Sequence, residues 1–583
     1  MTTKVDKRGR SRLQPYQGFT GLDSSRDLFN QDDGERQALH VLENAFADFR
    51  GQIVRDGPAD YRFGSQPVKH VIHYDTDVIV AATEYGDGIH LESEQSRASR
   101  VPVESTRVNF TVPLTQSSSA QINAGETALP YVHSEGQDIM VFRDDVLLQE
   151  GVGFNLNTAG VITLASPAVA GETISVAVGS TISNPVSYDF VLPSSAIVTS
   201  TVFNRAIMLT ARGLAPVIFD GDKFRASTST AATVALPAFC TTVQQRLCIA
   251  GLAASDTLVM IGAANTLDTF FGDEAVDSQN QLRSGNLDIA NLLGTADKIT
   301  GISSFETDKL AIFTNDRAFV YKLDPDITLW ELQTEASATY GCASHNTIKE
   351  AGTDLLYCSR SGIHALRRVT DNGLQISSVN LSEQIDQIYR SLFSQVSDPQ
   401  EITAVWDQDE SQYHVFFPVA RTGQFKRLTM TVNGGDAGTS FSTGDFANAR
   451  CGTTLGGNMV FGTSRGVFNI NKIESNEGAM PDVLVETPVL WMGALDGIKQ
   501  SSSITIQAYG DGELTITAID DQNRDKWQTT VMLTDEDDDG RRTVPLPRQY
   551  ERPMSIRFRG LRFKFEFKGT GLFRIIGFAV ELV

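Results

Sequence analysis

The amino-acid sequence predicts an all-β protein: a β-propeller of about six or seven blades, with an inserted small β-sandwich module and a C-terminal β-sandwich domain. Two observations point to this fold class. A short pattern recurs along the chain, in which an apolar strand, a polar turn and a second apolar strand follow one another. The chain also contains 48 glycines and frequent Asn-Gly, Asp-Gly and Gly-Gly pairs, which favour tight turns between strands.

The recurring pattern predicts a series of β-hairpins. In its clearest copy, residues 308–324, the apolar side chains of Leu310, Ile312, Phe319 and Tyr321 fall on alternating positions of two arms. Consecutive copies lie roughly 45–60 residues apart, which is the length of a four-stranded propeller blade. Because one hairpin cannot bury its apolar face, such units have to stack on one another. The other copies are residues 70–91, 206–222, 256–273, 354–368, 412–432 and 458–472.

Four regions are expected along the chain, because 583 residues exceed the usual size of a single core. Residues 1–104 would form an N-terminal arm and the first part of the propeller, with strands and tight turns in their middle. Residues 105–182 would form the inserted β-module, since insertions are best tolerated in loops. Residues 183–480 would complete the propeller, and residues 481–583 would form the C-terminal β-sandwich, with a basic outer face.

The predicted insert has a strand pattern of its own. Ile139, Val141, Val146 and Leu148 alternate with other residues on either side of a turn at residues 144–145. The pattern resembles that of the small β-modules in phage tail-fibre and tail-spike proteins. This resemblance implies a module that is displayed on a virion.

Residues 380–396 predict a helix, with Ser382 as its N-cap. The helix would cover the side of the propeller, or it would form a contact between subunits. The apolar side chains that share one of its faces are Ile385, Ile388, Tyr389, Leu392, Phe393 and Val396.

The C-terminal region predicts further strands. Residues 504–520 alternate as in a hairpin that turns at Asp511 and Gly512. Near the end of the chain, Phe563, Phe565 and Phe567 alternate with charged residues, so one face is expected to be buried and the other to be mainly basic.

Composition and charge exclude several functions. The formal net charge is −22, so the protein would repel the phosphate backbone and is not expected to wrap nucleic acid tightly. Five widely spaced cysteines without a Cys-x-x-Cys pair indicate reduced core residues, and neither a disulfide framework nor a zinc site. The first residues lack the apolar segment of a secretory signal, and no apolar run approaches the roughly 20 residues that span a bilayer. We therefore expect folding in a cytosol.

The sequence suggests no catalytic, cofactor-binding or metal-binding residues. Residues 462–466 match Gly-x-Ser-x-Gly, but the serine lies between two apolar arms and is expected in a hairpin turn, not in a nucleophile elbow. Residues 535–540 imitate the start of a calcium loop, yet Leu546 stands where that loop needs a glutamate, so an acidic surface loop is expected. His70 and His73 would point to opposite faces of a strand and could not share one metal ion.

The chain resembles the tail nozzle proteins of short-tailed bacteriophages, also called tail tubular protein B, a family related to the packaged-DNA stabilisation proteins. Three parts of the chain carry the resemblance: residues 21–57, residues 308–366 and residues 552–583. The resemblance implies a non-enzymatic ring of six subunits in the virion tail, assembled in the host cytoplasm below an adaptor protein. Such a ring retains the packaged genome, docks tail fibre or spike proteins, and lets double-stranded DNA pass without specific binding.

The charge distribution suggests one interface. Residues 541–583 hold ten basic and three acidic residues, a net charge of +7, which leaves −29 for the remainder of the chain. The last domain is therefore a candidate docking face for an acidic surface of the adaptor or of a neighbouring subunit. The same acidic surplus would let a channel repel DNA. The candidate interface residues are Arg557, Arg559, Arg562, Lys564, Lys568 and Arg574, and reversing the first three to glutamate is expected to weaken ring assembly and leave folding intact.

Two other functions stay open at this point. A host-surface or carbohydrate-binding tail protein would use an exposed site on the inserted module. A propeller glycosidase would place carboxylates around the propeller axis, and the sequence shows no repeated acidic motif that marks them.

Overall fold

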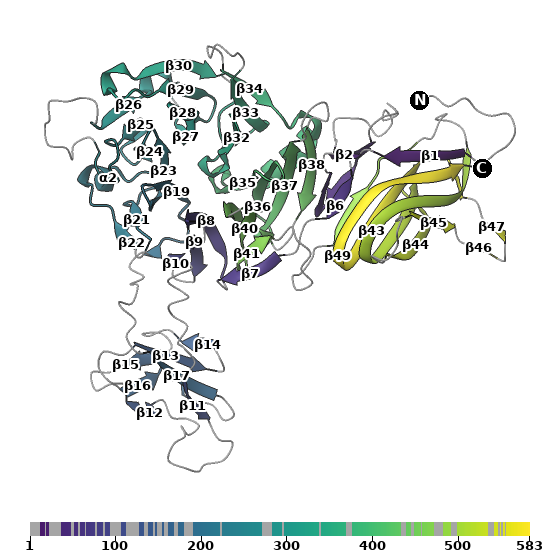
Figure 1. Ribbon diagram of the computed structural model, residues 1–583, viewed down its shortest axis with the longest axis horizontal. Coiled ribbons are helices and arrows are strands. Elements are labelled where there is room, and N and C mark those ends of the chain that lie inside the picture. The colour runs from purple at the N-terminus through teal and green to yellow at the C-terminus, as the bar shows by residue number, and fades with distance from the viewer. Residues whose placement is uncertain are drawn as a thin grey trace. The chain divides into compact units, whose positions relative to one another are not determined.

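The computed structural model describes the residues that form most strands and the connections of the propeller (Figure 1). Two compact units make up the chain, one formed by Met1–Leu91 with Phe190–Val583 and the other by Glu92–Asp189. The described residues are 12–17, 19–22, 37–47, 52–55, 59–63, 66–75, 78–85, 88–93, 107–111, 128–132, 138–143, 146–148, 154–156, 161–167, 173–179, 191–221, 224–270, 283–293, 297–336, 340–368, 376–432, 439–444, 448–455, 457–470, 482–490, 498–533, 541–545, 548–549, 552–553 and 556–582.

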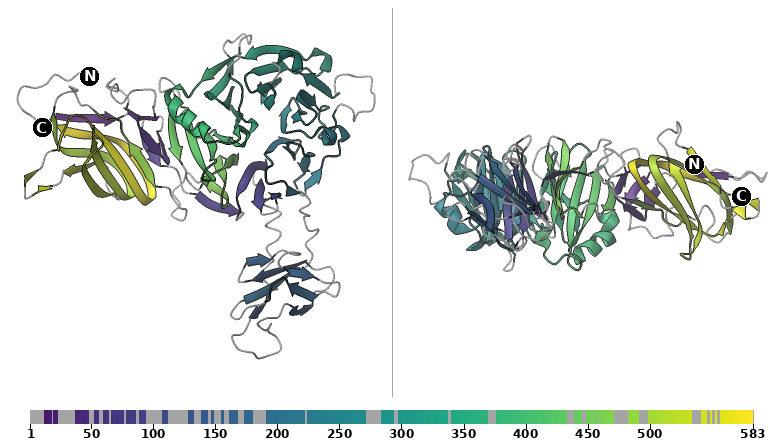
Figure 2. Two further views of the ribbon diagram at one scale, coloured as in Figure 1. Left: turned by 180° about the vertical axis from the view of Figure 1, so that it is seen from behind. Right: turned by 90° about the horizontal axis from the view of Figure 1, so that it is seen from below.

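Within these residues, seven four-stranded units succeed one another around a common centre, and we number them blades 1 to 7 (Figures 1 and 2). Blade 1 contains β8 (Val68–Asp75), β9 (Val78–Tyr85), β10 (Gly88–Ser93) and β18 (Val191–Leu192). Blade 2 contains β19 (Val198–Phe203), β20 (Ala206–Ala211), β21 (Val217–Phe219) and β22 (Phe224–Ala226). Blade 3 contains β23 (Phe239–Val243), β24 (Arg246–Leu252), β25 (Ser255–Ile261) and β26 (Gly285–Asp288). Blade 4 contains β27 (Ile299–Phe305), β28 (Lys309–Thr314), β29 (Ala318–Lys322) and β30 (Glu331–Ala336).

The remaining blades complete the ring. Blade 5 contains β31 (Lys349–Ala351), β32 (Asp354–Ser359), β33 (Gly362–Arg368) and β34 (Ile376–Asn380). Blade 6 contains β35 (Thr403–Asp407), β36 (Gln412–Val419), β37 (Gln424–Val432) and β38 (Thr439–Gly444). Blade 7 contains β39 (Cys451–Leu455), β40 (Asn458–Thr463), β41 (Gly466–Ile470) and, from the N-terminal part of the chain, β7 (Ala59–Phe63). Because β7 pairs with β41, the two ends of the propeller segment are joined in one blade.

The apolar residues of the blades explain why this ring forms. Each neighbouring pair of blades shares one hydrophobic cluster, seven clusters among the described residues. On β28, Leu310 and Ile312 pack towards blade 3, whereas Ala311 and Phe313 pack towards blade 5. A strand covered on both faces needs apolar residues at consecutive positions, and this strand has them. The predicted all-β propeller is confirmed.

Most of the predicted hairpins are present. Residues 308–324 form β28 and β29, in which Leu310 is opposite Tyr321 and Ile312 is opposite Phe319. The prediction for residues 256–273 is wrong in its second arm. There β25 pairs with β24 and β26, and Asp268 lies in a loop where it accepts hydrogen bonds from Thr228.

The second unit interrupts blade 1 between β10 and β18, which pair with each other. Its bounds, Glu92–Asp189, are wider than the predicted 105–182. Two sheets form it, one of four strands and one of three, as a small sandwich requires. The strands are β11 (Arg107–Thr111), β12 (Ala128–Val132), β13 (Asp138–Arg143), β14 (Val146–Leu148), β15 (Phe154–Leu156), β16 (Val161–Leu164) and β17 (Thr173–Gly179).

Two strands of 22 residues each, β43 (Lys499–Asp520) and β49 (Leu561–Leu582), form the centre of the C-terminal sheet. The predicted hairpin at Asp511 and Gly512 is wrong, because β43 continues through both residues beside β49. At Gly512, a Cβ atom would clash with the backbone of Lys568 and Gly569, so only glycine allows this close approach.

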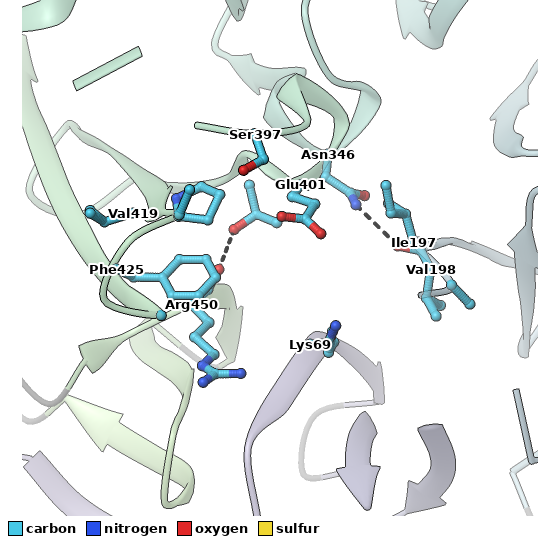
Figure 3. A pocket seen from close by; sticks show the side chains of 14 residues that line it. Lys69, Ile197, Val198, Asn346, Ser397, Glu401, Val419, Phe425 and Arg450 are labelled. Carbon is cyan, nitrogen blue, oxygen red and sulfur yellow. Dashed lines mark hydrogen bonds between the residues drawn. The ribbon is translucent and has the colours of Figure 1, made fainter. Parts of the chain in front are cut away.

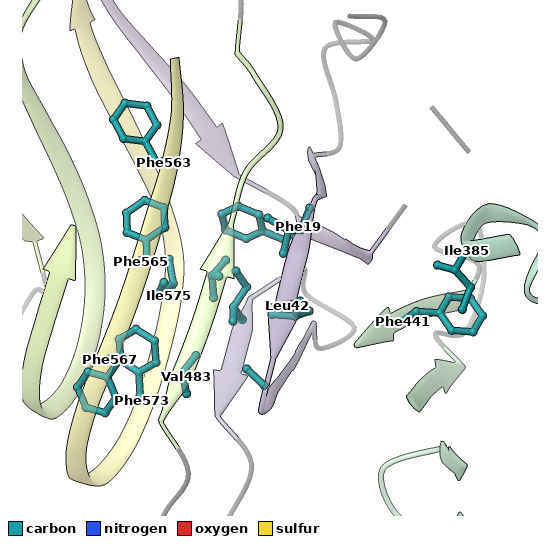
Figure 4. Close-up of a cluster of buried hydrophobic side chains, with 14 of the residues drawn as sticks. Phe19, Leu42, Ile385, Phe441, Val483, Phe563, Phe565, Phe567, Phe573 and Ile575 are labelled. Atoms are coloured by element: carbon teal, nitrogen blue, oxygen red, sulfur yellow. The ribbon is translucent and has the colours of Figure 1, made fainter. Parts of the chain in front are cut away.

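Both long strands bend sharply. Phe563 and Phe578 lie 15 residues apart on β49, so a straight strand would separate them by about 50 Å. Their ring centroids are 5.3 Å apart, because the sheet curls and brings its two halves face to face (Figure 4). β-Bulges between Gln507 and Ala508 and between Gly510 and Gly512 provide the curvature. One curled sheet thus supplies both layers of the predicted sandwich.

Residues 12–17, 41–43, 45–47 and 53–55 belong to the same sheet as β43 and β49, a pairing that the expected N-terminal arm did not include, whereas residues 59–93 contribute strands to the propeller, as predicted. The strand β1 (Arg12–Gln17) pairs along the end of β49. Nearby, β4 (Val41–Glu43) joins β38 of blade 6 to β42 (Val483–Glu486), which pairs with β49. The same sheet also contains β5 (Ala45–Ala47), β6 (Ile53–Arg55), β44 (Asp525–Leu533), β45 (Arg541–Pro545) and β48 (Ile556–Phe558). Two further pairs form small sheets of their own, β2 (Phe19–Leu22) with β3 (Gln37–Leu39) and β46 (Arg548–Gln549) with β47 (Arg552–Pro553).

The predicted helix is shorter than 380–396. It comprises the 3₁₀ turn η5 (Glu383–Ile385) and α3 (Asp386–Ser394), and its buried residues Ile385 and Tyr389 pack on the core that blades 5 and 6 share. Ser382 occupies the predicted N-cap position, but its side chain makes no capping hydrogen bond; its hydroxyl accepts from the Ile363 amide at 2.9 Å.

Short helical elements also occur in several connections. They are α2 (Thr230–Ala235), η2 (Ala290–Leu292), η3 (Ile327–Leu329), η4 (His345–Thr347) and η6 (Pro399–Glu401). None of the helices in the described part of the chain is long and apolar enough to cross a membrane.

Candidate functional site

Residues 341–348, which we call the axis segment, connect blade 4 to blade 5 and occupy the centre of the propeller. The Asn346 side chain donates a hydrogen bond from Nδ2 to the Val198 carbonyl of blade 2 at 3.0 Å. The ring of His345 stacks on Phe239 of blade 3, with centroids 5.3 Å apart. A segment that contacts blades on opposite sides of the ring has to cross its axis.

The axis segment is held by further contacts with blades 4 and 6. The Tyr413 hydroxyl of blade 6 donates to the Thr347 carbonyl at 2.5 Å. At Gly341, a Cβ atom would clash with the backbone of Thr314 and Asn315 in blade 4. This close approach requires glycine and keeps the segment against the inner strands.

Beside the axis segment lies a pocket with a volume of about 260 Å³ (Figure 3). Its walls come from the axis segment, from the starts of β8, β19, β35 and β39 with the residues before them, and from the hairpin of β36 and β37. The polar lining residues are Lys69, Asn346, Ser397, Glu401, Thr403 and Arg450, and the apolar ones include Ala196, Val198, Pro418, Val419 and Phe425.

Two cations of the pocket share one carboxylate. The Lys69 ammonium and the Arg450 guanidinium each lie 3.5 Å from a different oxygen of Glu84. Both distances exceed the 2.7–2.9 Å that is typical of a charge-assisted hydrogen bond. The buried Nε of Arg450 has no hydrogen-bond partner among the described residues. The Lys69 ammonium also donates to the Ser194 carbonyl at 3.0 Å, which leaves one of its three N–H groups for a ligand. The Arg450 guanidinium has further N–H groups besides the Nη1 that meets Glu84.

Glu401 lines the pocket between Asn346 and Lys69 (Figure 3), and its side chain is exposed. Partial burial raises its pKa above the usual value. Lys69 opposes this shift, whereas the nearby carboxylates of Asp398 and Glu84 add to it. The pocket region thus combines two cations, the Glu84 carboxylate that pairs with both of them, and the Glu401 carboxyl group. A ligand that donates a hydrogen bond to Glu401 would stabilise its ionised form.

The aromatic side of the pocket is Phe425. The guanidinium carbon of Arg450 lies 5.3 Å from the centroid of its ring, a cation–π distance. Val198 and Val419 line other parts of the wall. A ligand would meet an apolar surface next to the charged groups.

The basic residues predicted as an interface lie on β48, β49 and the turn between them, and they do not belong to this pocket. The predicted alternation is present, since Phe563, Phe565 and Phe567 are buried. Arg557, Arg559, Lys568 and Arg574 are exposed, and Arg562 and Lys564 are half-buried.

The face that carries these residues is less basic than predicted. Arg562 forms an ion pair with Glu486 on β42 at 2.8 Å, and Lys564 pairs with Glu566 at 2.9 Å. Reversing Arg562 to glutamate would place two carboxylates together in a partly buried site, so the predicted tolerance of the triple reversal is wrong for this residue.

The two histidines of β8 contact different blades, as expected for residues that cannot share a metal ion. His70 Nε2 lies 2.6 Å from the Ser200 hydroxyl of blade 2, and His73 Nδ1 lies 3.1 Å from the Thr453 hydroxyl of blade 7. Among the described residues, no three His, Cys, Asp or Glu side chains gather to hold a metal ion.

The other motifs considered in the sequence are the Gly-x-Ser-x-Gly match, the acidic loop and the cysteines. The serine of residues 462–466 is in the hairpin turn between β40 and β41, as predicted. The acidic residues 535–539 lie outside the described residues. All five cysteines are buried with free thiols, which confirms the predicted core role.

No pattern in the sequence predicts this pocket. Its charged residues, Lys69, Glu401 and Arg450, are distributed over almost 400 positions and form no motif. Each lies at or near the start of the first strand of a different blade, β8, β35 or β39, and only the propeller topology brings such positions together. The one signal in the sequence is a charged residue near the start of a strand, and many other strands of the chain have one as well.

No protein-family model and no curated protein sequence matches the chain. Several solved structures share part of its architecture. The mitotic checkpoint complex has a chain 10% identical, covering 50% of this chain and 82% of that chain with a TM-score of 0.30. The extracellular domain of a putative one-component system from B. thetaiotaomicron is 7% identical, with 82% and 48% covered and a TM-score of 0.33. A glycoside hydrolase family 43 arabinoxylan arabinofuranohydrolase from Bacillus subtilis is 10% identical, with 79% and 96% covered and a TM-score of 0.20. Similarities this low carry no argument about function.

Proposed function

We propose that this chain is a tail nozzle protein of a short-tailed bacteriophage, a structural and non-enzymatic part of the virion. Six copies form a ring below the adaptor protein in the tail, after assembly in the host cytoplasm. The ring extends the DNA channel, retains the packaged genome, docks tail fibre or spike proteins, and conducts double-stranded DNA at infection.

The observation that carries the proposal is where the three nozzle-like parts of the sequence lie in the fold. Residues 21–57 include β3 to β6, which join blade 6 to the C-terminal sheet. Residues 308–366 include the axis segment and the strands on either side of it. Residues 552–583 include β49, which pairs along its length with β43 in the C-terminal sheet. The three parts thus contribute strands to blades 4 and 5 and to the C-terminal sheet.

The centre of the propeller favours a passage for DNA between subunits, not within one. The axis segment crosses the propeller axis through the Asn346 and His345 contacts. Six identical subunits joined by heterologous contacts close a ring with a bore of its own. The net charge of −22 then disfavours trapping of the DNA phosphates inside that bore.

The exposed basic residues of the C-terminal sheet provide a test of ring assembly. We expect the double variant Arg557→Glu/Arg559→Glu to fold normally, because both side chains are exposed. We expect it to form fewer rings, since it removes positive charge from the face that would meet an acidic neighbour. Sedimentation velocity of the purified variant and the native protein measures the ring fraction.

The matched control is Lys322→Glu/Arg360→Glu, which makes the same change of charge at two exposed positions of blades 4 and 5. The control should assemble like the native protein. Equal ring fractions for the two double variants would refute the docking role of the C-terminal arginines.

A further inference from the structure

We propose that the pocket beside the axis segment binds one neutral sugar residue. Its charged lining residues are the cations Lys69 and Arg450 and the carboxyl group of Glu401. Glu84 does not line the pocket but pairs with both cations, so two cations and two carboxyl groups lie together here. An ionised ligand would leave an uncompensated charge in the pocket, which is costly where water is partly excluded. A neutral ligand leaves the balance between positive and negative charges unchanged.

Hydroxyl groups suit the polar groups that the protein leaves available. A hydroxyl both donates and accepts hydrogen bonds, whereas Lys69 and Arg450 only donate and an ionised Glu401 only accepts. Neighbouring hydroxyls of a sugar ring can therefore accept from Arg450 and donate to Glu401 at the same time. Hydrogen bonds of this kind, with one charged partner, are roughly twice as strong as neutral ones.

The apolar wall and the size of the pocket complete the match. The ring of Phe425 and the side chains of Val198 and Val419 offer a surface for the C–H face of a sugar ring. The volume of about 260 Å³ lies just below the roughly 300–1,000 Å³ of pockets for drug-sized ligands. One sugar residue fits this space, and a longer chain would have to extend outside it.

The ligand can be a free monosaccharide or the terminal residue of a glycan chain, since both present the same ring. The proposal is independent of ring assembly, because every group that it uses belongs to the propeller of one subunit. It also differs from the sequence-based alternative, which placed carbohydrate binding on the inserted module.

Saturation-transfer NMR on the full-length protein tests the proposal with a panel of neutral hexoses, 6-deoxyhexoses and N-acetylhexosamines at millimolar concentrations. Glucuronate and glucosamine serve as the anionic and cationic probes. We expect transfer to at least one neutral sugar and little transfer to the two charged probes. An oligosaccharide that ends in the same sugar should bind at least as tightly if the natural source is a glycan chain, and more weakly if it is the free sugar.

Two variants locate the site. Glu401→Gln should raise the dissociation constant of the bound sugar roughly tenfold or more, because a hydrogen bond to a charged group is lost. Phe425→Ala should weaken binding as well, by removing the apolar wall. The matched control Glu331→Gln changes an exposed glutamate on β30 of blade 4 and should leave binding unchanged.

Three results would overturn the proposal. The first is the absence of transfer to every neutral sugar of the panel. The second is preferential binding of either charged probe. The third is sugar binding that Glu401→Gln leaves as tight as in the native protein, which would place the sugar elsewhere on the molecule. Thermal unfolding of each variant shows whether it is folded, and Glu401 is exposed, so its substitution should not change the unfolding temperature.

Discussion

Acidification from pH 6.5 to about pH 3 is expected to lower the free energy of unfolding by several kcal/mol, because of two histidines at the propeller centre. Burial, together with a smaller effect of the Lys349 ammonium, lowers the pKa of His70 and of His345 to about 3. In this pH window the unfolded chain binds protons at both positions and the native protein does not. Each histidine then costs about 1.4 kcal/mol of stability per pH unit.

A double variant separates the histidines from the carboxyl groups that also titrate in acid. His70→Gln keeps a polar group near Ser200, and His345→Asn keeps an acceptor where Nδ1 meets the Ile302 amide at 3.3 Å. Urea unfolding at a series of pH values should show a flatter pH dependence for this variant than for the native protein. His40→Gln, at an exposed position, is the control. Parallel profiles for all three proteins would contradict the prediction.

The substitution Phe567→Ala is expected to lower the free energy of unfolding by about 3–5 kcal/mol, as usual for truncation of a fully buried aromatic residue. The Phe567 ring stacks on Phe573, with centroids 4.1 Å apart and planes within 7°. The guanidinium of the buried Arg55 lies 5.2 Å from the same ring and donates to the Gly569 carbonyl at 3.0 Å. The substitution leaves a cavity at the bend of β49 and removes the aromatic partner of a buried cation.

Urea unfolding followed by circular dichroism measures this loss. The comparison is Tyr61→Ala on β7, where the aromatic side chain is 61% exposed and the expected loss is less than about 1 kcal/mol. A loss of similar size in both variants would show that the aromatic cluster of the bend does not stabilise the C-terminal sheet.

The blades could be predicted from the sequence because the apolar pattern of each hairpin shows which of its residues are buried. Leu310, Ile312 and Phe319 alternate on strands that are covered on both faces, and the turn between the strands is local. Such signals depend only on residues close in the chain.

The C-terminal sheet could not be predicted in the same way. Asp511 and Gly512 have the composition of a hairpin turn, but the paired 22-residue strands continue through them and bend. Glycine is favoured both in a tight turn and at a bulge where two backbones come close together, so Gly512 alone does not distinguish the two structures. The pairing of β1 with β49 joins the two ends of the chain and has no local signal.

The pocket and the axis segment depend on distant contacts as well. Asn346 meets a carbonyl 148 positions away, and no pattern near it marks that partner. The sequence correctly predicted which residues of β49 face outward, but the pairing of Arg562 with Glu486 required the neighbouring strand. Local patterns therefore predicted elements and faces, whereas sites between elements required the topology.

Electron microscopy of the purified protein, alone and with its adaptor, tests the central claim that this chain forms a nozzle ring. The account predicts annular particles with sixfold symmetry and an open centre, which become more frequent or attach coaxially when the adaptor is added. Particles that stay monomeric in both samples would contradict it.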